Sequence, residues 1–112
     1  MEQRFQKFRE SRQAAVRLSI AGEDYLEPDL PEEYREAYTA YLKQRLIPAA
    51  EMFVRNEDTE RLEGLWCLQN FSAAMLEQLL SLSAREHRNA SYVWLLQKKQ
   101  ESFGFSPRDF SL

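Results

Sequence analysis

Apolar residues recur every three or four positions along much of the chain, a spacing that gathers them on one side of an α-helix. The longest such series is Tyr34, Ala37, Tyr38, Tyr41, Leu42, Leu46, Ala49, Ala50 and Phe53. Pro48 falls inside this series. Because a proline within a helix removes a backbone donor and crowds the preceding turn, we expect a kink or break near Leu46–Ile47. The pattern therefore predicts two helices, over residues 31–46 and 48–55.

The second half of the chain shows the same periodicity and predicts three more helices, over residues 59–69, 73–87 and 90–102. Residues suited to capping precede them, namely Asp58, Ser72 and Asn89. The expected buried positions are Leu62, Leu65, Trp66 and Gln69 in the first, Met75, Leu76, Leu79, Leu80, Leu82 and Ser83 in the second, and Tyr92, Val93, Leu95 and Leu96 in the third. In that last helix, Lys98 and Lys99 are expected to face water.

The N-terminal third is predicted to contain one helix, over residues 2–18, with Phe5 and Phe8 on its apolar side. A closing turn at Ala21-Gly22 would make residues 1–21 a basic N-terminal helix. Residues 22–31 then form an acidic loop, in which Asp29 is expected to cap the next helix.

The C-terminal end is predicted to leave the helical state at Gly104, since glycine readily adopts the left-handed conformation that ends helices. Residues 104–112 include the apolar side chains Phe105, Phe110 and Leu112. We therefore expect this tail to dock against the helical body of residues 32–103.

A length of 112 residues fits a single domain, and glycine and proline together number only seven. That is too few for a turn-rich β-sandwich or barrel. The chain is predicted to be one all-α domain of about five helices.

A helix–turn–helix pattern is visible in residues 79–97, LLSLSAREHRNASYVWLLQ, where a small residue, Ala84, precedes a short turn and a Leu95-Leu96 pair follows it. Residues 47–65, IPAAEMFVRNEDTERLEGL, contain a similar arrangement, and Ala50 stands 34 residues before Ala84. These segments resemble the helical hairpins of degenerate ankyrin repeats, whose period is about 33 residues. They depart from the family pattern at the turn, where Arg88 replaces glycine, and at Ser91, where an acidic residue is usual.

The resemblance covers residues 47–100 and implies two stacked ankyrin-like αα-hairpins, with the N-terminal helix packed along one side as a cap. It also implies a recognition scaffold without catalytic residues. The alternative that the sequence leaves open is a generic small helical bundle.

The charge is unevenly distributed, although the total is only −3. Residues 1–19 are basic and residues 23–36 are strongly acidic. The two segments are expected to attract each other, within the chain or between copies, or else to dock a charged partner. An acidic total argues against nucleic acid as the main partner, since such binding depends on a basic face.

Few residues are available for catalytic or metal chemistry. His87 is the one histidine, in a polar turn where a helix-end or solvent role is expected, and Cys67 is the one cysteine, expected to be a buried structural thiol. The three glycines are too far apart for a phosphate-binding loop. We therefore expect no enzymatic activity, no cofactor and no metal site. With no apolar leader and no membrane-spanning run, we expect a cytoplasmic protein that has no membrane partner.

Aromatic residues are the most suggestive candidates for a binding surface. Tyr34, Tyr38 and Tyr41 share one helix face, and Trp94 lies between two apolar residues. Each is either a core residue or a contact for a partner. We expect a protein–protein interaction or assembly module with a partner of unknown identity, and the open ends of a short stack predict a weak homodimer. The alternative is a nucleic-acid-associated regulator that uses the basic N-terminal helix and a helical hairpin.

Overall fold

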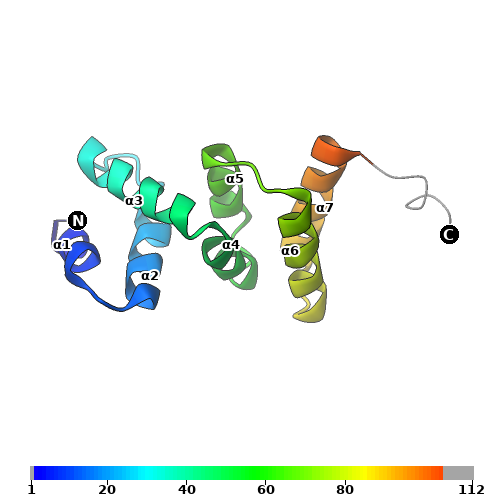
Figure 1. The fold of residues 1–112 in the computed structure, drawn as a ribbon, viewed down its shortest axis with the longest axis horizontal. Coiled ribbons are helices and arrows are strands. Elements are labelled where there is room, and N and C mark those ends of the chain that lie inside the picture. The colour runs from blue at the N-terminus through cyan, green and yellow to red at the C-terminus, as the bar shows by residue number, and fades with distance from the viewer. Residues whose placement is uncertain (1, 105–112) are drawn as a thin grey trace, which may run out of the picture.

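The computed structural model describes residues 2–104, and within them it is all-α (Figure 1). The described part contains seven helices rather than the expected five or so. They are α1 (Glu2–Glu10), α2 (Ala14–Asp24), α3 (Glu32–Gln44), α4 (Leu46–Arg55), α5 (Thr59–Leu68), α6 (Ala73–Arg85) and α7 (Asn89–Phe103). The predicted docking of the tail lies outside the described residues, apart from Gly104 itself.

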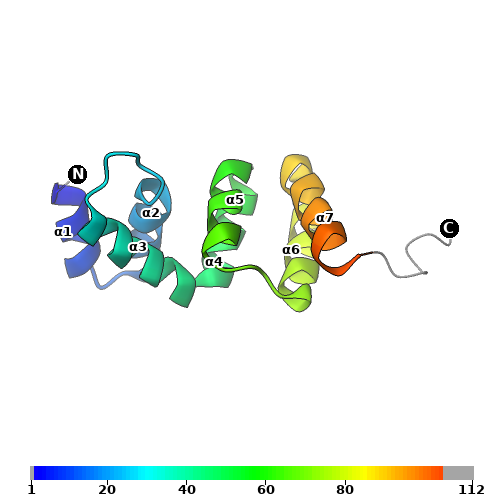
Figure 2. The same cartoon turned by 90° about the horizontal axis from the view of Figure 1, so that it is seen from above.

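The helices are arranged in an elongated row rather than in a compact globule. Helices α1–α3 occupy one end, the α4–α5 hairpin the middle and the α6–α7 hairpin the other end (Figures 1 and 2). The molecule measures 53 × 25 × 20 Å and has a radius of gyration of 15.4 Å. A compact domain of this length would have a radius of gyration of about 13 Å. Most helices therefore pack only against their neighbours in the row.

The expected N-terminal helix is divided in two. Helix α1 ends at Glu10, and the hydroxyl of Ser11 accepts a hydrogen bond from the backbone N–H of Gln13 (3.1 Å). Such a local bond competes with the helical pattern. Helix α2 then continues to Asp24, so Ala21 and Gly22 lie inside a helix and do not close one. The loop is accordingly shorter than predicted and covers residues 25–31.

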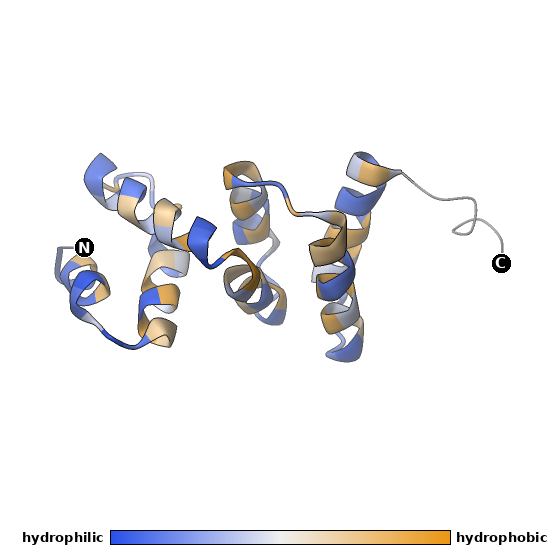
Figure 3. Cartoon of the chain, viewed as in Figure 1, coloured by the Kyte–Doolittle hydropathy of each residue, from blue (hydrophilic) through white to orange (hydrophobic). Residues whose placement is uncertain are grey.

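The predicted helix break before Pro48 is confirmed, but it falls at Arg45 rather than at Leu46–Ile47. Helices α3 and α4 are separated by Arg45, and Pro48 lies in the first turn of α4, where its missing N–H has no intrahelical acceptor to lose. The predicted cap at Asp29 is wrong, because Pro31 immediately precedes α3. Acidic residues still occupy the first turn of α3, and this end of the helix is hydrophilic in Figure 3.

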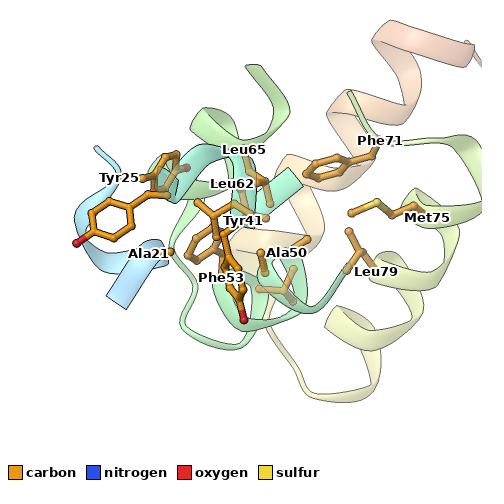
Figure 4. Packing of buried hydrophobic residues seen from close by; sticks show 14 of the residues in the cluster. Ala21, Tyr25, Tyr41, Ala50, Phe53, Leu62, Leu65, Phe71, Met75 and Leu79 are labelled. Carbon is orange, nitrogen blue, oxygen red and sulfur yellow. The ribbon is translucent and has the colours of Figure 1, made fainter. Parts of the chain in front are cut away.

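The core runs along the row between the paired helices. Side chains of α4, α5 and α6, including Phe53, Leu62, Leu65 and Leu79, meet in its middle (Figure 4). All six positions predicted to be buried in α6 are buried. In α5, Leu62 and Leu65 are buried, Trp66 is half-buried and Gln69 is exposed.

The buried face of α7 differs from the prediction. Ser91 and Leu95 are its buried residues, whereas Tyr92 and Val93 are exposed and Leu96 is half-buried. Helix α7 packs mainly against α6 and α5 because it stands at the end of the row. The expectation that its lysines face water is also wrong. Lys98 and Lys99 are half-buried; Lys98 pairs with Glu63 (3.0 Å) and Lys99 with Glu77 (2.8 Å).

The turns of the two hairpins share one backbone geometry. Glu57 and His87 both have left-handed φ values, 54° and 56°, and they stand 30 residues apart. In each turn the next residue donates a hydrogen bond to a carbonyl five positions earlier: Asp58 to Phe53 (2.9 Å) and Arg88 to Ser83 (2.7 Å). The turns thus define an offset of 30 residues. The expected 34-residue pairing of Ala50 with Ala84 does not hold, because Ala50 is buried and Ala84 is exposed.

Helix caps connect the hairpins to each other. Asp58 and Ser72 cap α5 and α6 as predicted, but Asn89 is the first residue of α7 and does not cap it. The carboxylate of Glu57 does so instead, accepting hydrogen bonds from the backbone N–H groups of Ala90 and Ser91. The hydroxyl of Ser91 in turn donates to the carbonyl of Val54 (3.1 Å). The turn of one hairpin therefore completes the outer helix of the next.

A second connection joins the N-terminal helices to the middle hairpin. The guanidinium of Arg61 donates to the carbonyls of Gly22 (2.9 Å) and Glu23 (2.8 Å), which are unsatisfied acceptors at the end of α2. The hydroxyl of Tyr25 donates to the carbonyl of Arg61. Tyr25 approaches so closely that a Cβ atom at Gly64 would overlap its hydroxyl. A glycine at position 64 is what allows this packing.

Candidate interaction surfaces

The tyrosine stripe of α3 is covered by α1. Tyr38 and Tyr41 are buried, with 0% and 6% of their surfaces exposed, and Tyr34 is half-buried. Phe8 meets both buried tyrosines edge-on, at centroid distances of 5.0 and 5.3 Å. Phe5 stacks on Tyr34 at 3.9 Å. Tyr38 and Tyr41 are therefore core residues, which is one of the two roles that the sequence left open for them.

The two buried tyrosine hydroxyls differ in their surroundings. The hydroxyl of Tyr41 donates to the carbonyl of Ala14 (3.3 Å), whereas that of Tyr38 has no hydrogen-bond partner among the described residues. Burial raises the pKa of Tyr38. This ring is held by aromatic packing rather than by its polar end.

Trp94 joins the two hairpins. Its indole N–H donates to the carboxylate of Glu63 on α5 (3.1 Å), and its ring meets that of Trp66 edge-on at 6.3 Å. The ammonium of Lys98 lies 5.6 and 5.5 Å from the centroids of these two rings. Such cation–π contacts stabilise partly buried cations. Trp94 is half-buried, and its contacts give it a structural role between α5 and α7.

Helix α7 carries an exposed side without charged residues. Among the described residues, the large hydrophobic side chains classed as exposed are Ile47 (38%), Tyr92 (38%), Val93 (63%) and Phe103 (53%), and three of these four belong to α7. Helical spacing places these three on one side of α7, about 60–160° around the helix from Leu95, together with neighbours that are also uncharged. We call this set the α7 outer face, and it consists of Tyr92, Val93, Leu96, Gln97, Gln100 and Phe103.

The oppositely charged N-terminal segments do attract each other within the chain. Arg4 of α1 pairs with Glu23 (2.6 Å) and Asp24 (2.7 Å) at the end of α2. These ion pairs clasp α1 onto α2. The expected attraction between the basic and the acidic segment is therefore confirmed within the chain.

The residues considered for reactive chemistry lie apart. His87 is exposed in the turn before α7, and Cys67 is exposed on α5, so the expectation of a buried thiol is wrong. No three of the described histidine, cysteine, aspartate and glutamate residues form a group that could hold a metal ion. Over residues 2–104, no helix has both the length and the apolar character needed to cross a membrane.

Comparison of the chain with protein-family models, with curated proteins and with solved structures gives no match. The sequence had not indicated two features found here, the cap provided by Glu57 and the α7 outer face. The first depends on a contact between residues more than 30 positions apart. The second was obscured because apolar residues occur nearly all around α7, so their spacing did not select a buried side.

Proposed function

We propose that the chain is a protein–protein interaction or assembly module without catalytic activity, and that the α7 outer face is its contact surface. The observation that carries this proposal is the exposure of Val93, Tyr92 and Phe103 on one uncharged helix side. Charged residues make up 29% of the chain, so a long exposed side without one is unusual for a surface left in water. Contact surfaces are typically depleted of charge in just this way.

The position of this face in the row supports the same proposal. Stacked helical hairpins bury one side of each unit against the next, and the last unit keeps an open side. Among the described residues, α7 is the last helix of the row. We further propose that α4–α5 and α6–α7 are ankyrin-like units, a proposal supported by their shared turn geometry, and that the protein acts in the cytoplasm.

The test is a charge placed on the α7 outer face. Val93→Glu should lower the affinity for a protein partner at least tenfold, because a carboxylate would be desolvated in the contact. Gln78→Glu, on the exposed side of α6, is the matched control and should leave binding unchanged. Binding is measured by quantitative co-purification from the native cell, with sedimentation velocity of each purified variant to detect a homodimer.

Thermal unfolding must first show that both variants remain folded. Equal recovery of the same partner with Val93→Glu and with the unchanged chain would refute the α7 outer face as the contact. Association with duplex DNA that weakens steeply with salt, without any protein partner or self-association, would favour the nucleic-acid alternative over an interaction module.

A further inference from the structure

A hollow of about 450 Å³ opens between α1 and α3, at the opposite end of the row from the α7 outer face. Phe5, Phe8 and Tyr41 contribute aromatic rings to its lining. Helix α3 also contributes Glu33, Ala37, Ala40 and Gln44, and the short side chains of the two alanines leave the space open. The hollow therefore offers a partly apolar surface that is large enough for a side chain of a bound peptide.

Two arginines line the same hollow, and one of them is fixed in place. The Nε–H of Arg17 donates to the carbonyl of Phe8 (3.1 Å). Its guanidinium carbon lies 5.0 Å from the ring centroid of Phe8 and 4.7 Å from that of Tyr41. Arg9 stands over the ring of Phe5 at 5.8 Å. An arginine held in this way loses little conformational freedom when it binds an anion.

Neither arginine has an acidic partner within the described part of the chain. Four other arginines do form ion pairs there, namely Arg4, Arg35, Arg55 and Arg61. Arg9 and Arg17 instead line the hollow and meet only aromatic rings and a backbone carbonyl. Their positive charge is available to a ligand.

The hollow also has a negative end. Glu33 lines it near the start of α3, and Tyr41 lies eight residues further along the helix. At a rise of 1.5 Å per residue, these positions are separated by about 12 Å. An extended peptide covers this distance in about four residues. Arg9 also lines a neighbouring hollow with Glu10 and Glu33, so acidic side chains outnumber the arginine at that end, whereas Arg17 lies at the end near Tyr41. The site thus distinguishes the two ends of a short segment.

We propose that this hollow binds an acidic peptide segment of a partner protein. A carboxylate of the segment pairs with Arg17, which lies against Tyr41, and an apolar side chain beside it lies against Ala37 and Ala40. About four residues further along, at the end near Glu33, the segment is neutral or basic. A nucleic acid fits less well because Glu33, in the first turn of α3, lines the hollow and would face the phosphate backbone.

The experiment is a selection of linear peptides from a random phage-displayed library on the full chain, followed by calorimetric titration of the selected peptides. We expect these peptides to combine aspartate or glutamate with a neighbouring apolar residue. Their affinity should fall at least tenfold for the double variant Arg9→Gln/Arg17→Gln. The double variant Arg55→Gln/Arg85→Gln removes the same charge from α4 and α6 and should change affinity less than twofold.

Two further variants separate the possible causes of a loss. Ala40→Glu leaves both arginines in place but offers them an internal carboxylate at an exposed helix position, so it should also weaken binding tenfold. Val93→Glu alters only the α7 outer face and should leave peptide affinity unchanged, which distinguishes this site from the proposed function. The proposal is overturned if selection yields no binding peptide, or only peptides that lack acidic residues. It is also overturned if neither Arg9→Gln/Arg17→Gln nor Ala40→Glu weakens binding. It is also overturned if duplex DNA or a second copy of the chain occupies the hollow instead.

Discussion

The carboxylate of Glu57 accepts a hydrogen bond of 2.9 Å from the backbone N–H of Ser91, and so caps the outer helix of a different hairpin. Its other oxygen takes the N–H of Ala90 (3.1 Å). We expect Glu57→Gln to lower the free energy of unfolding by about 0.5–2 kcal/mol, the usual range for loss of a helix cap. Denaturant unfolding at neutral pH measures this loss, with Glu36→Gln on the exposed side of α3 as a control that should have little effect.

The same contact predicts a dependence on pH. The hydrogen bond from the Ser91 backbone is the main cause that lowers the pKa of Glu57 in the folded protein. A carboxylate whose pKa is lowered by folding stabilises the protein above its unfolded pKa, about 4.3, and this contribution disappears as the pH falls through the folded pKa. The stability difference between the unchanged chain and Glu57→Gln should therefore be constant near pH 7 and shrink below about pH 4. A difference that grows on acidification would contradict this role.

The two left-handed turn residues should respond differently to glycine. His87 is exposed, has a φ of 56° and makes no side-chain hydrogen bond within residues 2–104, so His87→Gly should raise the free energy of unfolding by about 1 kcal/mol. Glu57→Gly relieves the same backbone strain but removes the cap of α7. It should therefore raise the free energy of unfolding by less than His87→Gly does, or lower it. Equal gains for the two variants in chemical denaturation would show that the cap contributes nothing.

The packing around Gly64 predicts a different cost at each of two helical glycines. A Cβ at Gly64 would lie 2.5 Å from the hydroxyl of Tyr25, which is anchored to Arg61, whereas a Cβ at Gly22 would meet the flexible end of Met52 at 2.6 Å. Gly64→Ala should cost about 1–3 kcal/mol, as overpacking usually does. Gly22→Ala should change stability by less than about 1 kcal/mol, since alanine also favours the helix.

A double variant tests whether the hydroxyl of Tyr25 is what makes a side chain at position 64 costly. In a Tyr25→Phe background the atom that a Cβ at position 64 would meet first is gone, so the cost of Gly64→Ala should shrink. Thermal or denaturant melts of the two single variants and the double variant give the coupling between the sites. Strict additivity would mean that the strain lies elsewhere.

Two leucines of the last hairpin should differ in their contribution to stability. Leu79 is fully buried in α6, so Leu79→Ala should lower the free energy of unfolding by about 2–5 kcal/mol. Leu96 is half-buried beside the α7 outer face, and its removal leaves a smaller cavity. Leu96→Ala should cost less than half as much in urea unfolding; equal losses would show that α7 is covered in solution.

The sequence predicted the fold best where one helix side is clearly apolar and a capping residue precedes it. Helix α6 satisfies both conditions, since Ser72 caps it and all six expected positions are buried. Prediction failed where tertiary contacts decide. Gly22 is predicted to end a helix, yet it lies within α2, where its lack of a side chain allows Met52 and Phe53 to pack closely.

The candidate surfaces were harder to predict than the helices. The spacing of Tyr34, Tyr38 and Tyr41 showed that they share a face, but not that α1 would cover it. The sequence shows Arg17 only as part of a basic segment, because its place against Phe8 and Tyr41 arises when α1 ends at Glu10 and the chain turns back. Periodicity locates a side of a helix; the neighbouring helices decide whether that side is exposed.

The cap provided by Glu57 makes hydrogen exchange in α7 depend on another hairpin. The amide hydrogens of Ala90 and Ser91 belong to the first turn of α7, where a helix supplies no acceptor of its own, and their acceptor lies in the turn after α4. Any local opening of the turn at residues 56–58 therefore exposes both amides to solvent while α7 itself is still helical. The coupling also runs in the other direction, since the hydroxyl of Ser91 at the start of α7 donates to the carbonyl of Val54 near the end of α4. Local opening of the turn at residues 56–58 or of the start of α7 therefore lowers the protection of the other hairpin as well.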